Sequence, residues 1–328
     1  MPAGRLRLGF QVWGQFVGWD ELMAIGREID ELGFDELWSN DHLLPQAAGG
    51  VGELGGLDGP VFEGWSILFG WAGLTRGVRM GCLVSGAAYR NPGLLVKMAT
   101  ALDHATGGRA VLGLGAGWFE REHRAFGFGF PPLGPRIDRF AEAAAICRGL
   151  LDGVSVTVAG DWYAMTDARN DPAPIQSRLP LAIGGSGEKR TLRIVARYGD
   201  IWNADGDDPA SFARRSGILD EHCAAVGRDP ASIERTAGLP PPCIRESREA
   251  AVEALAAILE RQAMPRSAAL EMASRSPFVG PVDPVTDELR RYRDAGLGAA
   301  MFDWPAPFDR PTLEALAGPV RDALIADG

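Results

Sequence analysis

The chain has 328 residues, of which 46% are hydrophobic and 23% charged, and its net charge is −10. These values are typical of a globular protein, and the length suits one α/β barrel with insertions. Nucleic acids and anionic membrane surfaces bind proteins mainly through Lys and Arg, so the acidic balance and the lack of a basic run exclude both as partners.

The first part of the chain alternates between strand-like and helix-like segments. Residues 5–13 and 34–39 are rich in β-forming side chains, and apolar residues at helical spacing lie between them. The segment 62–74 has the length of a helix but is apolar nearly all round. A helix of this kind is buried on several sides, so on the outside of a barrel we expect a partner subunit to cover it.

The alternation continues through the middle of the chain. A strand over 78–86 precedes Asn91 and Pro92, which supply an N-cap and a first-turn proline for the next helix. Residues 109–117 form a nearly continuous apolar run, as in a strand of a parallel sheet. A helix follows over about 136–151.

Four more strands follow an excursion of short strands and turns near 155–176. We expect these strands over 179–185, 200–206, 233–239 and 299–304, and helices that begin near Ser186, Pro209, Ser247, Asp283 and Pro311. Repeated strand–helix units give parallel strands with right-handed crossovers, and eight of them close a (β/α)8 barrel, the TIM barrel of the α/β class. No break in composition divides the chain, so we expect one domain over residues 1–328.

Polar residues follow the second predicted strand. Active sites of such barrels lie at the carboxyl ends of the strands, and here Ser39 and Asn40 are followed by Asp41 and His42. Asp41 would accept a hydrogen bond from a ring N–H, and His42 would carry a proton. An Asx turn with an incidental histidine is the alternative interpretation of these residues.

Glycines follow the fourth predicted strand. The run from Gly113 to Trp118 has the spacing GxGxG instead of GxGxxG, so a Rossmann dinucleotide site is a weak interpretation. Glycines here would let the backbone approach a flat ligand closely, and tight turn geometry is an equal alternative. His123 lies farther along and would line the mouth of the barrel, while Asp303 at the end of the eighth strand is a possible polar contact.

A second glycine-rich run follows the fifth predicted strand. Residues Gly184–Gly187 would open a helix, and a helix N-terminus with small residues is a ready anion site. Lys189 and Arg190 in the first turn would oppose the helix dipole unless a phosphate is bound nearby. Side chains that point into solvent are the alternative, and the run lacks the G-K-[ST] of a P-loop.

No metal site is expected. The four cysteines form no CxxC pair, and no histidine or carboxylate set has metal-ligand spacing. Buried, reduced thiols fit a cytoplasmic protein. The N-terminal MPAGRLRLGF lacks the apolar region of a signal peptide, and no apolar stretch approaches the roughly 20 residues of a membrane span.

Taken together, these segments resemble the luciferase-like monooxygenase superfamily, and most of all its branch of oxidoreductases that use the deazaflavin coenzyme F420. The most specific stretches are VLGLGAGWFEREHRAFGFGFPP and PLAIGGSGEKRTLRIVARYGDIWN. The stretches ELGFDELWSNDH and GCLVSGAAYRNPGLLVKMATALDHATGGR, and the FDW near the end, add to the resemblance. It covers the chain to about Asn203 and is looser beyond.

The resemblance implies a bacterial-luciferase-like barrel with the cofactor at its mouth. Asp41 and His42 would face the reactive ring. The strand end near Ser85 would hold a bulge, often a non-proline cis peptide, within Cys82–Gly86. The remaining residues implied in cofactor binding are Gly115, Ala116, Gly117 and Trp118 along its chain, with His123 nearby, and Gly184, Gly185, Ser186 and Gly187 at its phosphate. Members are commonly dimers, which agrees with the apolar helix.

The resemblance implies hydride transfer between F420 and a small organic substrate. His42 would donate or accept a proton, and Asp41 would position the ring. Two alternatives remain, an FMN-dependent monooxygenase that uses O2 and a cofactor-binding barrel without catalysis. The segments SNDH and EREH favour the deazaflavin branch. Members that oxidise sugar phosphates use basic residues in the later loops, and this sequence has no such cluster there, so it does not imply a substrate.

Overall fold

Eight parallel strands close a barrel in the computed structural model, which describes residues 5–46, 58–206 and 208–326. The strands are β1 Arg7–Val12, β2 Glu36–Ser39, β3 Arg79–Cys82, β5 Ala110–Gly115, β8 Leu181–Gly184, β9 Ile201–Ala204, β10 Glu234–Leu239 and β13 Ala299–Trp304. The first and last strands pair in register, and β3 pairs with β5 to complete the ring. The predicted (β/α)8 barrel is therefore confirmed.

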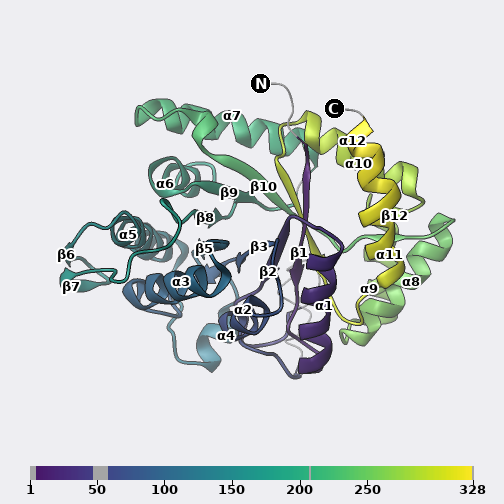
Figure 1. Cartoon of the computed structure of the whole chain (residues 1–328), viewed down its shortest axis with the longest axis horizontal. Coiled ribbons are helices and arrows are strands. Elements are labelled where there is room, and N and C mark those ends of the chain that lie inside the picture. The colour runs from purple at the N-terminus through teal and green to yellow at the C-terminus, as the bar shows by residue number, and fades with distance from the viewer. Residues whose placement is uncertain (1–4, 47–57, 207, 327–328) are drawn as a thin grey trace.

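The barrel is covered by helices on its outside (Figure 1). These are α1 Trp19–Glu31, α2 Gly64–Ala72, α3 Pro92–Thr106, α5 Leu133–Leu151, α6 Thr191–Tyr198, α7 Pro209–Ala225, α10 Val282–Asp294, α11 Arg310–Ala315 and α12 Arg321–Ala326. The predicted cap of α3 is confirmed, because the Asn91 side chain accepts a hydrogen bond from the Gly93 amide. No helix in the three described ranges combines the length and apolarity that a bilayer crossing needs.

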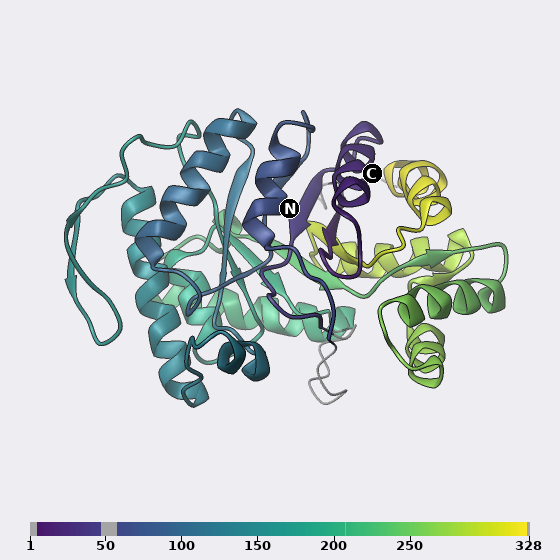
Figure 2. The same cartoon turned by 90° about the horizontal axis from the view of Figure 1, so that it is seen from below.

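Two insertions depart from the barrel. The antiparallel hairpin of β6 Val156–Ala159 and β7 Ala164–Ala168 projects from one side (Figure 2), where an excursion of short strands was predicted. At the other side, α8 Arg248–Arg261 and α9 Arg266–Arg275 form a helical lobe. The strands β11 Cys243–Ile244 and β12 Val279–Gly280 connect this lobe to the barrel. The sequence predicted α8 alone of these four elements.

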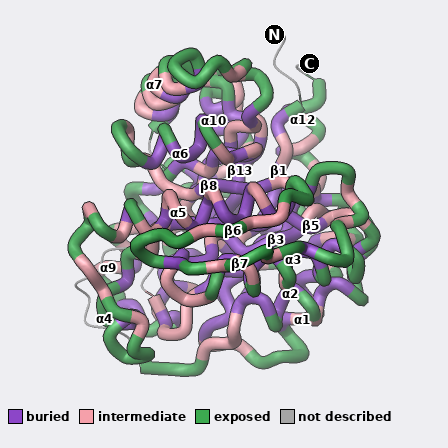
Figure 3. The backbone as a smooth tube through the Cα atoms, turned by 90° about the vertical axis from the view of Figure 1, so that its left-hand side faces the viewer, coloured by how far each residue is buried: buried purple, intermediate pink, exposed green. Residues whose placement is uncertain are grey.

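The apolar helix α2 is covered by its own chain, so the expectation that a partner subunit buries it is wrong. Trp65 and Trp71 have no exposed surface, and only Phe69 and a few neighbours reach solvent, with Phe69 at 40% exposure. The Trp71 indole donates to the Leu22 carbonyl of α1 at 2.8 Å. A side chain at Gly26 would collide with that indole. Helix α2 thus packs beside α1 and α3 on the outside of the barrel, whose strands form the buried interior in Figure 3.

Candidate functional site

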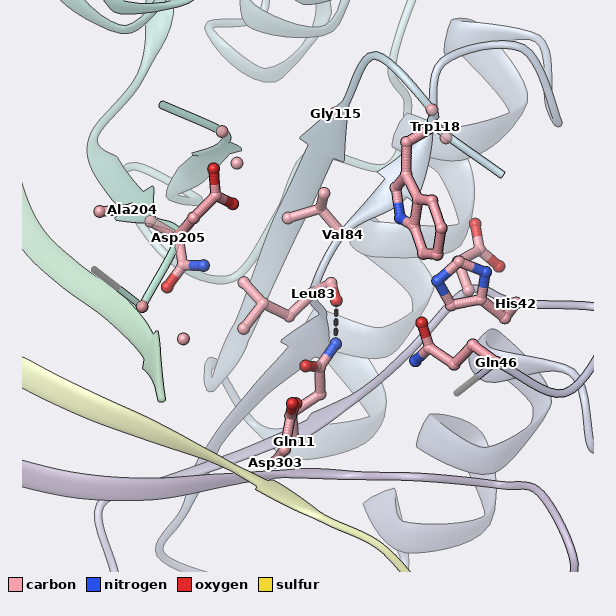
Figure 4. Close-up of a pocket in the computed structure, with 18 of the residues that line it drawn as sticks. Gln11, His42, Gln46, Leu83, Val84, Gly115, Trp118, Ala204, Asp205 and Asp303 are labelled. Carbon is pink, nitrogen blue, oxygen red and sulfur yellow. Dashed lines mark hydrogen bonds between the residues drawn. The ribbon is translucent and has the colours of Figure 1, made fainter. Parts of the chain in front are cut away.

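A cavity of about 780 Å³ lies at the carboxyl ends of the barrel strands, within the size range of small-molecule sites. Figure 4 shows residues from several strands around it. The structure brings Asp41, Gly115 and Gly184 together in its wall, as the sequence predicted. Residues far apart in the chain meet here because all eight strands end at the same rim.

Leu83 and Val84 protrude into this cavity between β3 and the two-residue strand β4 Ser85–Gly86. The peptide bond that joins them is cis, inside the stretch that the resemblance implied. The Gln11 side-chain amide donates to the Leu83 carbonyl (Figure 4) and fixes the protrusion from β1. Together these two apolar side chains offer a surface on which a flat ring would rest.

The glycines of β5 and β8 make room for this protrusion. A Cβ at Gly115 would lie 2.6 Å from Val84, and one at Gly184 would lie 2.9 Å from it. A Cβ at Gly113 would lie 1.9 Å from the Cys82 carbonyl oxygen. Glycine is thus required by the protrusion at Gly115 and Gly184 and by β3 at Gly113, whereas the sequence suggested close approach to a ligand or a tight turn.

Ser85 does not line the cavity, contrary to what the resemblance implied. Its side chain is fully buried, and its hydroxyl accepts a hydrogen bond of 2.9 Å from the Trp65 indole. The hydroxyl therefore lies behind the protrusion, towards α2. Leu83, Val84 and Gly86 are the residues of this segment that face the cavity.

His42 lies in the cavity wall and is held by a buried carboxylate. Its Nδ1 lies 3.2 Å from Oε2 of Glu122, which belongs to the short helix α4 Glu120–Ala125. The ring also contacts Trp118 edge to face, with centroids 5.4 Å apart. Because Nδ1 is engaged by the carboxylate, Nε2 is the ring nitrogen left to serve a ligand.

Glu122 is the centre of a dense hydrogen-bond network. Besides His42, it accepts from the Tyr89 hydroxyl, from the Leu43 amide and, at 3.0 Å, from the Leu44 amide. Burial alone would raise the pKa of Glu122, but the bonds from His42, Tyr89 and Leu43 hold it below its ordinary value. Glu122 is thus ionised at neutral pH, and the histidine Nδ1 donates to it.

Asp41 is paired and does not stand free in the cavity. Arg90 donates to both of its carboxylate oxygens, at 2.5 and 2.9 Å, and also contacts Glu63 at 2.5 Å. Burial raises the pKa of Asp41 to about 6, and the Arg90 guanidinium limits that rise. The pair closes the wall next to His42.

The predicted residues after β5 line the cavity, except for His123, which was expected to line its mouth. Ala116, Gly117 and Trp118 line the wall, and Trp118 keeps 45% of its surface exposed. His123 is fully buried behind Gly117, with Nδ1 bonded to the Gly129 carbonyl at 3.0 Å. Desolvation lowers the pKa of His123, so the ring is a neutral structural group.

The glycine run after β8 reaches the cavity only in part. Gly184 and Gly185 line it, but Ser186 and Gly187 do not. Helix α6 begins at Thr191, five residues later than predicted. Gly185 takes φ +117°, and a turn intervenes before the helix, so the chain is not yet helical at residue 186.

The cation Arg190 has simpler partners than a phosphate, and Lys189 is exposed. Arg190 bonds the Gly134 carbonyl and the Asp138 carboxylate on α5, which explains its place before the helix. The Ser186 hydroxyl accepts from the Asp205 amide at 3.0 Å. Thr191 is the residue of α6 that lines the cavity, so the helix N-terminus faces it there.

Sequence reasoning missed Glu122, Arg90, Tyr89 and Gln11 as parts of the site. Each acts through a contact with a residue far away in the chain, such as the 80 residues between His42 and Glu122. Local patterns do not reveal such pairs. The one signal available was the segment EREH, which contains Glu122 and was noted only as part of the resemblance.

Comparisons with known proteins agree on the family. The model of the luciferase-like monooxygenase family matches residues 9–301. The F420-dependent glucose-6-phosphate dehydrogenase of Microbacterium testaceum is 30% identical over 226 residues, which cover 68% of this chain and 64% of that protein. The 4-hydroxyprotoasukamycin monooxygenase of Streptomyces nodosus subsp. asukaensis is 32% identical over 183 residues, or 55% of this chain and 45% of that protein.

The chain thus matches less than two thirds of the length of either relative. Among solved structures, the coenzyme F420-dependent tetrahydromethanopterin reductase of Methanopyrus kandleri superposes with a TM-score of 0.79. The superposition covers 98% of this chain and 100% of that one at 17% identity. At that identity the likeness establishes the shared fold.

Proposed function

Since the chain belongs to the luciferase-like monooxygenase family, we propose that it is an oxidoreductase that transfers hydride between coenzyme F420 and a small organic substrate. The observation that carries this proposal is the His42–Glu122 pair at the cavity wall. A hydride transfer to a carbonyl, or from an alcohol, needs a proton moved at the substrate oxygen, and a histidine with one nitrogen anchored is suited to that task.

The residues around the cavity fit a flavin-like group. Leu83 and Val84 give an apolar seat for a ring, and Ala116 and Gly117 leave an open wall beside it. The bound cofactor would supply the hydride chemistry. The chain's own part is to orient the ring, to exclude water, and to hold or release a proton at Nε2 of His42.

Glu122→Gln should lower kcat by about 10–100-fold, as removal of a partner that orients a functional histidine does elsewhere. The neutral amide no longer anchors the Nδ1–H, while its oxygen still accepts from the backbone amides of the loop. Cofactor affinity, measured by fluorescence titration, should stay within about threefold of wild type. Glu120→Gln, on the same helix and paired with Arg124 at the surface, is the matched control. Equal kcat values for the two variants would contradict the assigned role.

The phosphate of the cofactor would bind between Gly185 and the N-terminus of α6 at Thr191. Gly187→Asp would place a carboxylate next to Thr191, because a Cβ there lies 2.6 Å from the threonine hydroxyl. At a few ångströms and an effective dielectric near 20 the repulsion is about 4 kcal/mol before relaxation. We expect cofactor affinity to fall by at least about fivefold.

The matched control for that variant is Gly73→Asp, where an added Cβ meets no heavy atom within 4 Å. It adds the same charge at an open position after α2. If Gly187→Asp folds normally and binds F420 as tightly as Gly73→Asp does, the phosphate lies elsewhere.

The alternative function is an FMN-dependent monooxygenase, which the likeness to 4-hydroxyprotoasukamycin monooxygenase supports. An anaerobic assay separates the two. Oxidised F420 with a panel of secondary alcohols, or reduced F420 with ketones, should show a change in cofactor absorbance that needs no oxygen. Transfer of an oxygen atom from O2 to an organic substrate in the presence of reduced FMN, and no anaerobic reaction with F420, would favour the monooxygenase. A barrel without catalysis would give neither signal, and the presence of the His42–Glu122 pair in the cavity wall favours catalysis.

We also propose a homodimer in the cytoplasm. The resemblance supports the dimer. Helix α2 no longer supports it, because its own chain covers this helix. Sedimentation at micromolar concentration should give twice the 35.0 kDa mass of the chain, and a monomer would contradict the dimer. The four cysteines are free and buried, which fits a reducing compartment.

A further inference from the structure

Asp303 lies near the carboxyl end of β13, on the cavity wall, and its carboxylate has weak hydrogen bonding. It pairs in register with Gln11 of β1, and Figure 4 shows both residues below Leu83. The Trp13 indole donates a long hydrogen bond of 3.3 Å to Asp303. The other buried carboxylates of the site have strong partners, as Asp41 has in Arg90 and Glu122 has in His42.

Of the described residues that line the cavity, His42 is the one whose positive charge acts on this carboxylate. Among the described residues that line the cavity, the acids are Asp41, Asp205 and Asp303, and none is Lys or Arg. The residues outside the described ranges contain no Lys or Arg in the sequence either. An anionic substrate group beside Asp303 would therefore meet a carboxyl group and no Lys or Arg side chain, whereas the cofactor phosphate would lie at the α6 end of the cavity.

We propose that Asp303 is the substrate-contacting residue that makes the cavity selective for uncharged alcohols and carbonyl compounds over phosphorylated or carboxylated ones. This inference rests on the proposed function, because it names the substrate class of the same cavity. A carboxyl group has the right chemistry for a neutral substrate, since it accepts a hydrogen bond from a hydroxyl and, when protonated, donates one to a carbonyl oxygen.

The surroundings of Asp303 support this role. Desolvation raises its pKa to about 7, with the Trp13 bond and the His42 charge acting against the rise. Near neutral pH the group is thus present in both forms. The protonated form serves a carbonyl oxygen and the ionised form serves a hydroxyl, which suits a reaction that interconverts the two.

The test compares two secondary alcohols that share the 3-hydroxybutanoyl group, the neutral ethyl 3-hydroxybutyrate and the anionic 3-hydroxybutyrate, which lacks the ethyl group. In wild type at pH 8 we expect kcat/KM with F420 to favour the ester by at least about tenfold. Dissociation constants measured by NMR titration of the cofactor-loaded protein should differ in the same direction. Asp303→Asn should reduce both ratios several-fold, because it removes the charge and keeps the shape.

The control is Asp161→Asn, on the exposed turn of the β6–β7 hairpin, which removes the same charge far from the cavity and should leave both ratios unchanged. The inference is overturned if wild type uses the acid as well as the ester, or if Asp303→Asn leaves the ratios unchanged. It is also overturned if F420 binds but neither alcohol does. If F420 itself does not bind, the proposed function fails, and NMR titration of the cofactor-free protein still decides the charge preference.

Discussion

Replacement of His42 by alanine should slow turnover with F420 by about 10²–10⁴-fold, the usual contribution of a positioned acid–base group. The imidazole lies in the cavity wall, and its Nδ1 bond to Glu122 fixes the ring so that Nε2 serves the substrate. Cofactor affinity should change by no more than about threefold, because the ring seat is formed by Leu83 and Val84. Steady-state absorbance gives kcat, and fluorescence titration gives the affinity.

The matched control is His104→Ala. His104 lies on α3, is exposed, and bonds the Ala173 carbonyl at 2.9 Å, away from the cavity. Its loss should leave kcat within about twofold of wild type. If His42→Ala retains more than a tenth of the wild-type kcat, another group moves the proton. If it loses cofactor affinity and turnover in equal measure, His42 serves binding and not proton transfer.

Arg90→Met should lower the free energy of unfolding by about 3–5 kcal/mol, as expected when one partner of a buried ion pair is removed. Arg90 binds both oxygens of Asp41, which is 3% exposed, and Glu63 as well. The loss should be smaller at pH 5 than at pH 8, since without Arg90 the buried carboxyl can take up a proton. Urea unfolding followed by circular dichroism measures the change.

Two further variants make this result specific. Asp41→Asn combined with Arg90→Met should cost less than the sum of the single changes, because the stranded charge is then gone. Arg27→Met removes an exposed pair to Glu31 at 3.7 Å on α1 and should cost less than about 1 kcal/mol. A cost for Arg90→Met no greater than that of Arg27→Met would show that the Asp41 pair does not stabilise the wall.

The barrel was predictable because its determinants are local. The alternation of strands and helices, and the cap at Asn91 with Pro92, depend on neighbours a few residues apart. The predicted start of α6 is five residues too early, because glycines occur both in the first turn of a helix and in the turn that precedes it. The positive φ of Gly185 is not helical, so α6 begins later, at Thr191. Helix α9 and the β11–β12 pair were not predicted, because their sequence patterns are weak and their formation depends on packing within the lobe.

The site residues at the strand ends were predictable, but their hydrogen-bond and ion-pair partners were not. Asp41, His42 and the glycines after β5 and β8 follow strands directly, and strand ends meet at one rim. Their partners Arg90 and Glu122 lie on other segments, and nothing in the local sequence selects them. Trp65 and Trp71 are a further example, because the sequence of an apolar helix is the same whether its own chain or a partner subunit buries it.

The most direct test of the proposed function is an equilibrium titration of the purified, cofactor-free protein with F420 and, separately, with FMN. We expect F420 to bind at least about tenfold more tightly than FMN, and a neutral secondary alcohol to reduce the bound cofactor without oxygen. Tighter binding of FMN, together with transfer of an oxygen atom from O2 to a substrate when the bound flavin is reduced, would contradict this proposal and make the chain a flavin monooxygenase.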